Sequence, residues 1–181
     1  MSDDDRLRWD RRHAGQDPVE LDEVALPAVF RPYATEFPVA GRALELACGR
    51  GAAAVWLALR GMDVRGVDIS PAAVEAARGL ARRCRIAERC HFDIVDLDDG
   101  LPPGKPVDVL LCNKFRDQRL DHPVLERLAP GGLLALSALS EVGAGPGPFR
   151  VRPGELTDAF AVLDVITSGE ADGQAWLLAR R

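Results

Sequence analysis

The sequence has no hydrophobic run approaching the ~20 residues that a membrane-spanning helix needs. Its first residues, MSDDDRLRWDRRHAG, lack the apolar core of a secretory signal peptide. The four cysteines contain no C-x-x-C pair and the three histidines are scattered, so no zinc site is expected. These absences predict a cytoplasmic protein with reduced thiols, no metal site and no contact with a membrane.

An excess of positive charge is also missing. The 181 residues carry a formal net charge of −5, which argues against a nucleic-acid partner, because phosphate binding depends on clustered Lys and Arg. Four arginines lie between residues 6 and 12, but the acidic residues 3–5 nearly cancel them, so a solvated tail is predicted there. With 47% hydrophobic and 28% charged residues, the composition is that of an ordinary globular protein with one domain.

What the sequence does contain is an alternation of strand and helix patterns. Strands are expected at Arg42 to Leu46, Asp63 to Val67, His91 to Val95, Val107 to Cys112 and Leu133 to Leu139. Helices are expected between them at Ala52 to Arg60, Pro71 to Arg83 and Asp121 to Leu128, the last closed by Pro130-Gly131-Gly132. This rhythm predicts an α/β fold with three layers, a Rossmann-like, doubly wound sheet.

The two ends of the chain depart from this rhythm. After a loop at 142–152 and a helix at Pro153 to Phe160, strands at Ala161 to Thr167 and Gln174 to Ala179 lie too close for a parallel crossover. They predict an antiparallel C-terminal hairpin in a mostly parallel, seven-stranded sheet. Residues 1–40 hold four prolines and predict a helical lid segment over one end of the sheet, within the same domain as a core at 41–181.

A cofactor cradle is predicted where the first strand meets its helix. Gly49 and Gly51 lie in that turn, where glycines allow close approach of a ligand to the backbone and to the first helical N–H groups. The segment from Gly49 to Ala54 also satisfies the dinucleotide pattern G-x-G-x-x-G/A, and Asp68 follows at about the distance of a ribose-binding acid. NAD is therefore one candidate.

Glu45 favours a different cofactor. It lies four positions before Gly49, where a carboxylate would repel a pyrophosphate but attract a sulfonium and an ammonium group. Opposite charges near 4 Å gain on the order of 4 kcal/mol at an effective dielectric constant of 20. The sign of this charge predicts S-adenosyl-L-methionine rather than NAD.

Two further acids follow the next two strands. Asp68 is predicted to accept hydrogen bonds from both ribose hydroxyls, with Ile69 covering one face of the adenine. Asp96 is predicted to accept from the adenine amine, while the amide of Leu97 donates to the ring. Together with Glu45 these acids lie at the carboxyl edge of one sheet, where such folds bind ligands.

These motifs resemble those of the class I S-adenosylmethionine-dependent methyltransferases. The resemblance covers Arg42 to Arg181, and LACGRGAAAVWLA, GVDISPAAVEAAR, PGGLLALSALSE and RPGEL are most similar to the bacterial tellurite-resistance-type small methyltransferases. Ala47 replaces the usual first loop glycine, as it often does in that subgroup, and Cys48 lies inside the loop, where a small apolar residue suffices. The resemblance implies a methyltransferase.

Methyl transfer chiefly requires a nucleophile held in line with the methyl group. The resemblance places the residues after the fourth strand near that group, namely Cys112, Asn113, Lys114 and Phe115. It also implies that the Trp9 to His13 segment closes over the cofactor. His13, Asn113 and Lys114 are the catalytic candidates, and no catalytic residue is identified; Arg116 and Arg119 either hold an anionic acceptor or are solvated.

Because a class I core would occupy nearly all of this chain, a small-molecule acceptor is expected. Two alternatives stay open at this point. One is a non-catalytic module that binds S-adenosylmethionine as a regulator or partner subunit, and the other is an NAD-dependent oxidoreductase. The sequence specifies neither the acceptor's nucleophilic atom nor the oligomeric state.

Overall fold

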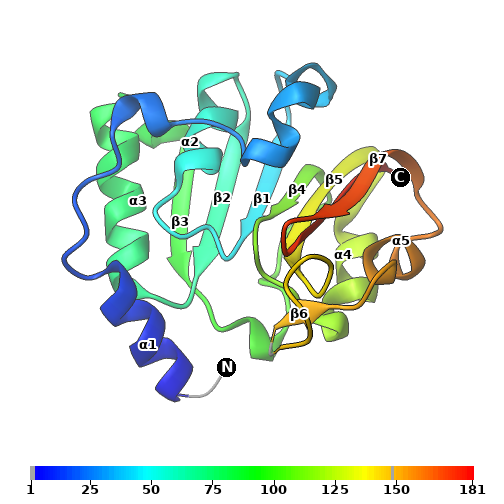
Figure 1. Ribbon diagram of the computed structural model, residues 1–181. Coiled ribbons are helices and arrows are strands. Elements are labelled where there is room, and N and C mark those ends of the chain that lie inside the picture. The colour runs from blue at the N-terminus through cyan, green and yellow to red at the C-terminus, as the bar shows by residue number, and fades with distance from the viewer. Residues whose placement is uncertain (1–2, 148) are drawn as a thin grey trace.

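A mixed sheet forms the centre of the molecule (Figure 1). A computed structural model describes residues 3–147 and 149–181. The strands are β1 Arg42–Leu46, β2 Asp63–Asp68, β3 Cys90–Ile94, β4 Val107–Cys112, β5 Leu128–Ser140, β6 Arg150–Val151, β7 Asp164–Ala171 and β8 Gln174–Arg180. The α-helices are α1 Asp3–His13, α2 Ala52–Leu59, α3 Pro71–Arg83, α4 Asp121–Arg127 and α5 Glu155–Ala159. Short 3-10 helices are η1 Leu21–Glu23, η2 Ala28–Glu36, η3 Ala87–Arg89, η4 Leu97–Asp99 and η5 Gln118–Leu120.

The strand order is β3-β2-β1-β4-β5-β8-β7, and β6 pairs with β5 beside this path. Strands β1 to β5 are parallel, whereas β8 runs antiparallel to both β5 and β7. The chain winds outward from β1 to β3 and then returns to β4, so β1 and β4 flank the topological switch point. In doubly wound folds ligands bind outside the carboxyl ends of the strands at this point.

Two layers of apolar side chains cover the two faces of the sheet. Alternate residues of β1 point to opposite faces, and Ala43 packs with α2, α3 and η2, whereas Leu44 and Leu46 pack with α4 and α5. The same alternation directs Glu45 to the α2 side. The predicted doubly wound α/β fold and its C-terminal hairpin are therefore confirmed.

The structure corrects several boundaries. The hairpin turn consists of Asp172 and Gly173, both at positive φ, rather than about six residues, because β7 extends to Ala171. The Pro130-Gly131-Gly132 segment lies within β5 rather than closing a helix, and part of the predicted loop at 142–152 forms the two-residue β6. β3 begins one residue earlier than predicted, at Cys90.

The largest correction concerns the N-terminus. Residues 3–13 form the helix α1 rather than a solvated tail, and α1 lies against α3 at the end of the sheet where the parallel strands finish (Figure 1). An apolar stripe is the signal that predicts a packed helix from sequence. This segment has no such stripe and carries charge on nearly every side.

Within residues 3–147 and 149–181, no helix has the length and apolar character needed to cross a bilayer. The same residues contain no group of three or more His, Cys, Asp or Glu side chains placed to hold a metal ion.

Candidate active site

The loop between β1 and α2 forms a tight cradle at the switch point. Ala47, Gly49 and Gly51 all have positive φ, which bends the backbone of this loop tightly. Gly51, the N-cap of α2, has a φ of 80°, and a Cβ atom there would lie 2.7 Å from the Cβ of Ala77 on α3. Glycine is therefore required at Gly51 both for its backbone conformation and for the close packing of the loop on α3.

We expect Gly51→Ala to lower the free energy of unfolding by about 2 to 3 kcal/mol, since it combines an unfavourable φ with overpacking. Chemical denaturation measures this change. Gly131→Ala is the matched control, because Gly131 has a φ of 75° but a Cβ atom there would meet no atom of the described residues within 4 Å. The control should lose only the smaller backbone contribution; equal losses in both variants would contradict the packing argument.

Asp68, at the end of β2, connects the cradle to the next loop. One carboxylate oxygen accepts a hydrogen bond of 2.8 Å from the Gly49 N–H, and the other accepts one of 2.9 Å from the Ser70 N–H. The side chain is buried, with 7% of its residue surface exposed. Asp68 thus orients the glycine loop, and its remaining lone pairs face the same edge of the sheet.

Glu45 is buried in the cradle floor without a full set of partners. Its residue is 3% exposed, and its Oε2 atom has no hydrogen-bond partner within the described part of the chain. Burial raises the pKa of Glu45 to about 8, and the negative charge of Asp68 adds to the increase, while the Ala54 amide opposes it. The sequence suggested a standing negative charge here; in the ligand-free protein the carboxyl is instead largely protonated at neutral pH.

Two cavities meet at Glu45, Cys48 and Asn113. The first, called the cradle cavity, has a volume of about 530 Å³ and is lined by Trp9, Arg12, His13, Glu45, Ala47, Cys48, Gly49, Asp68, Ile69, Val95, Leu97, Asn113, Lys114, Phe115 and Leu139. The second, called the side cavity, has a volume of about 460 Å³ and is lined by Val19, Asp22, Glu23, Ala25, Leu26, Pro27, Arg31, Glu45, Cys48, Arg50, Gly51, Ala52, Ala53 and Asn113. The N-terminal segment therefore contributes walls to both.

Most of the predicted site residues line one of these cavities, and Gly51 lines the side cavity. Two do not line either. The Asp96 carboxylate accepts a hydrogen bond from the Asp98 N–H at the start of η4, and Cys112 is buried with its Sγ directed at the Phe115 carbonyl. Their roles toward a cofactor remain predictions.

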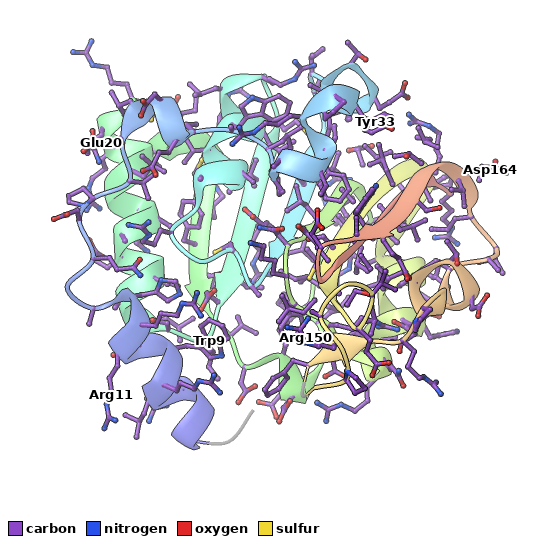
Figure 2. The ribbon with its side chains drawn as sticks, in the orientation of Figure 1. Trp9, Arg11, Glu20, Tyr33, Arg150 and Asp164 are labelled. Carbon is purple, nitrogen blue, oxygen red and sulfur yellow. The ribbon has the colours of Figure 1, made fainter. Side chains whose placement is uncertain are left out.

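Asp10 anchors helix α1 beside the cradle. One carboxylate oxygen of Asp10 accepts hydrogen bonds from the Ser70 hydroxyl, at 2.9 Å, and from the Ala72 N–H, at 3.0 Å, at the first turn of α3. Figure 2 shows Trp9 on the side of α1 toward the sheet and Arg11 on the outer side. This contact docks a helix that has no apolar face of its own.

His13 lies at the end of α1 beside the cradle. Its ring stacks on Trp9 with 6.3 Å between centroids, and its buried Nδ1 has no hydrogen-bond partner among the described residues. Burial lowers the pKa of His13, although the charge of Asp68 opposes this change. The imidazole is therefore neutral near pH 7 and able to accept a proton, which keeps it among the catalytic candidates.

We expect Asp10→Ala to detach α1, because the capping contact is worth about 1 kcal/mol and few apolar contacts replace it. Trypsin cleavage after Arg11 and Arg12 should become about fivefold faster. Hydrogen bonds from Ala72 and Ser70 hold the pKa of Asp10 below its usual value, so the same release is expected in wild type as the pH falls through that lowered pKa. Asp164→Ala, at the start of the distant β7, is the control; equal cleavage of both variants would contradict the docking role.

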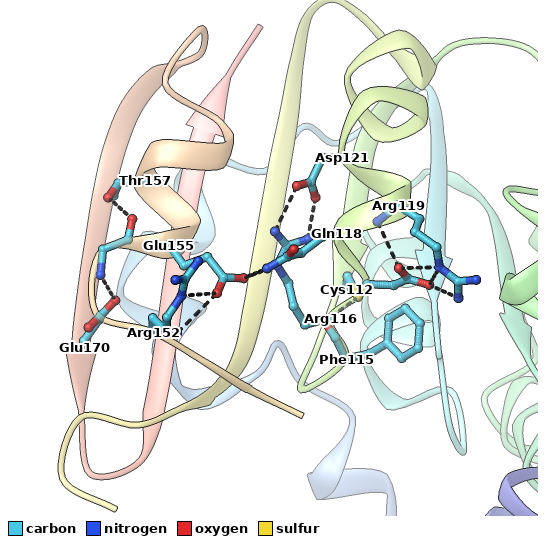
Figure 3. A network of polar contacts seen from close by, with 12 residues as sticks. Cys112, Phe115, Arg116, Gln118, Arg119, Asp121, Arg152, Glu155, Thr157 and Glu170 are labelled. Atoms are coloured by element: carbon cyan, nitrogen blue, oxygen red, sulfur yellow. Dashed lines mark hydrogen bonds and ion pairs between the residues drawn. The ribbon is translucent and has the colours of Figure 1, made fainter. Parts of the chain in front are cut away.

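Arg116 and Arg119 both form ion pairs with carboxylates of the chain. Arg116 is nearly buried and forms ion pairs with Asp121 and Glu155. Arg119 is exposed but pairs with Asp117 and with Asp98 at 2.6 Å. Figure 3 shows this network joining the loop after β4 to the segment around α5. Both arginines thus fix the shape of the loop.

Ser137 was not identified from the sequence as a residue that supports the site. Ser137, on β5, is fully buried, and its hydroxyl contacts both Asn113 and the Lys114 backbone. A single polar residue within the apolar run LLALSAL was the available signal.

Comparison with known proteins agrees with this geometry. A family model described as a methyltransferase domain matches residues 43–132, which include the cradle and β1 to β4. The chain is 33% identical over 112 residues to the ribosomal RNA small subunit methyltransferase C of Alcanivorax borkumensis, covering 56% of this chain and 33% of that protein. It is 29% identical over 160 residues to the trans-aconitate 2-methyltransferase of Methylobacterium radiotolerans, covering 74% and 59%. The chain thus spans between about a third and three-fifths of the length of these relatives.

Solved structures share the fold at low sequence identity. TehB from Haemophilus influenzae superposes with a TM-score of 0.71 and 16% identity, covering 93% of this chain and 64% of TehB. The magnesium protoporphyrin IX methyltransferase of Synechocystis, solved with bound S-adenosylmethionine, gives a TM-score of 0.68 and 18% identity, covering 97% and 90%. The chain therefore contains a methyltransferase domain and has the fold of the class I S-adenosylmethionine-dependent methyltransferases.

Proposed function

We propose that this chain is an enzyme that binds S-adenosylmethionine in the cradle cavity and transfers its methyl group to a small-molecule acceptor. The observation that carries the proposal is that Glu45 lines both cavities while its Oε2 has no hydrogen-bond partner among the described residues. A buried polar atom without a partner is costly, and a cationic ligand would provide the missing one. A pyrophosphate supplies no positive charge, so it would not favour the ionised form of Glu45.

The residues around the cradle fit the different parts of this cofactor. We assign the amino-acid end to Glu45 and the glycine loop, and the ribose hydroxyls to Asp68. Ile69, Val95 and Leu97 supply apolar surface on the cradle cavity that suits an adenine ring. Bound S-adenosylmethionine supplies a methyl group activated by its positive sulfonium.

The contribution of the chain itself is orientation and exclusion of water. Glu45 would release its proton to solvent when a cation binds, so that its negative charge faces the ammonium group at the amino-acid end of the cofactor. Trp9 and His13 of α1 close the cradle, and neutral His13 can take a proton from an acceptor that has one to lose. Placing an acceptor in line with the methyl then accounts for most of the rate increase.

The side cavity supports a small acceptor. Its volume of about 460 Å³ lies within the usual range of small-molecule sites, and it shares the lining residue Asn113 with the cradle cavity. Among the relatives, the ribosomal RNA and ribosomal protein L11 methyltransferases act on large acceptors and the trans-aconitate enzyme on a small one. The volume of the side cavity favours the second kind for this chain.

Calorimetry with S-adenosylhomocysteine tests cofactor binding, and methylation of a panel of thiols, carboxylates and phenols, detected as S-adenosylhomocysteine formation, tests turnover. Absence of binding at millimolar ligand would overturn the proposal. Binding without methylation of any acceptor, large or small, would instead favour a non-catalytic module. Methylation restricted to ribosomal RNA or protein would contradict the small acceptor.

A further inference from the structure

The contacts of Ser137 determine the orientation of the Asn113 side chain. The hydroxyl oxygen of Ser137 accepts a hydrogen bond of 3.1 Å from the Lys114 N–H, and the hydroxyl lies 2.7 Å from the Oδ1 atom of Asn113. Ser137 is 0% exposed, so water does not compete for these bonds. A serine hydroxyl has only one hydrogen, and within the described residues Oδ1 of Asn113 accepts it.

This arrangement places the two ends of the Asn113 amide in different surroundings. The oxygen faces Ser137 in the protein interior, and the Nδ2 group forms no hydrogen bond within the part of the chain that the structure describes. Asn113 follows β4 directly and is one of the three residues shared by the cradle cavity and the side cavity. The N–H donors of its amide are therefore available at the junction of the two cavities.

The backbone beside Asn113 depends on the same serine. Lys114 has a φ of 57°, a left-handed conformation that costs energy in a residue with a side chain. The bond from its N–H to Ser137 stabilises this turn and places Asn113 at the junction. Ser137 thus fixes both the backbone and the side-chain orientation of its neighbour on β4.

We infer that Ser137 is a positioning residue that directs the Asn113 amide N–H groups at the point where acceptor and methyl group meet. The inference rests on the proposed function, since it needs a cofactor in the cradle cavity. It narrows the acceptor class, because an N–H donor pairs with an atom that presents a lone pair, such as a carboxylate or phenolate oxygen or a thiolate. A protonated amine is disfavoured at this point.

Sinefungin tests this orientation without knowledge of the acceptor. In this analogue of S-adenosylmethionine, a carbon that bears an ammonium group replaces the methylated sulfur, whereas S-adenosylhomocysteine has no group there. Wild-type protein should bind sinefungin more weakly than S-adenosylhomocysteine, because the Asn113 donors face the ammonium. In Ser137→Ala the amide is free to turn its oxygen outward, and the affinity ratio should shift toward sinefungin by about tenfold, the scale of one hydrogen bond to a charged group.

Two more variants complete the experiment. Asn113→Asp should shift the affinity ratio toward sinefungin by more than Ser137→Ala does. If Ser137→Ala does not fold, the ratio in Asn113→Asp tests the inference. Ser140→Ala is the matched control, since Ser140 is equally buried on β5 but, among the described residues, its side chain bonds only to the Val142 N–H. Its ratio should equal that of wild type.

The outcomes separate this inference from the function on which it rests. If wild type binds neither compound, the proposed function fails and the inference fails with it. If both compounds bind but the ratio is unchanged in Asn113→Asp, or is unchanged in folded Ser137→Ala, the inference alone is overturned.

Discussion

Glu45→Gln should weaken the binding of S-adenosylmethionine by about 10- to 100-fold while making the ligand-free protein more stable at alkaline pH. The loss of affinity follows from removing the charge that would face the cationic ligand, at about 1.5 to 3 kcal/mol for a hydrogen bond to a charged group. Calorimetry in buffers of different ionisation enthalpy measures it directly. Wild type should release up to one proton per cofactor bound near pH 7, and the variant none.

The stability change has a definite direction. The pKa of Glu45 is about 8 in the folded protein and near 4.5 in the unfolded chain, so between these values only the folded form keeps its proton. The stability of wild type therefore falls as pH rises through this window, by about 1.4 kcal/mol per pH unit from this group, and levels off above pH 8. The glutamine side chain does not ionise, so the Glu45→Gln protein should be more stable than wild type by on the order of 4 kcal/mol at pH 8 and above.

Glu88→Gln provides the control for both effects, because it removes one carboxylate from an exposed position in η3. It should change neither the cofactor affinity nor the slope of stability against pH. If Glu45→Gln matched this control, the buried carboxyl would have no role in cofactor binding.

Asp68→Ala should weaken the binding of S-adenosylhomocysteine by about 30- to 150-fold, or roughly 2 to 3 kcal/mol. Two causes act together. The predicted ribose hydrogen bonds are lost, and the Gly49 and Ser70 N–H groups lose the acceptor that fixes the glycine loop. Calorimetry gives the affinity, and faster hydrogen exchange at Gly49 would report the loosened loop.

Two comparisons sharpen this experiment. Asp68→Asn keeps one carbonyl acceptor and should lie between wild type and Asp68→Ala. Asp63→Ala removes an exposed acid from the opposite end of β2, where it pairs with Arg89, and should leave the affinity unchanged. Undiminished affinity in Asp68→Ala would show that the ribose assignment is wrong.

The core of the fold could be predicted because its signals are local. Period-two and continuous apolar patterns indicate β1 to β5, and Ser70 with Pro71 indicates the start of α3, where the Ser70 side chain does accept from the Ala73 N–H. The same local signals predicted that Glu45 and Asp68 lie at one edge of the sheet, because parallel strands end together.

The features that escaped prediction depend on distant partners. Helix α1 is held by Asp10, whose partners lie about 60 residues away, rather than by an apolar stripe. The role of Ser137 depends on Asn113 across the β4–β5 pair. The pKa of Glu45 depends on how completely the folded chain buries it. Sequence patterns carry little information about such long-range contacts.

The buried Arg116 limits which sequence changes this protein can tolerate. Its ion pairs with Asp121 and Glu155 couple the loop after β4 to α5, two segments more than 30 residues apart. A substitution that reshapes one segment leaves a charge unpaired in the other, at a cost of several kcal/mol. Libraries that vary residues 115–121 should therefore vary residues 152–156 with them, because libraries that change only one segment will contain fewer folded members.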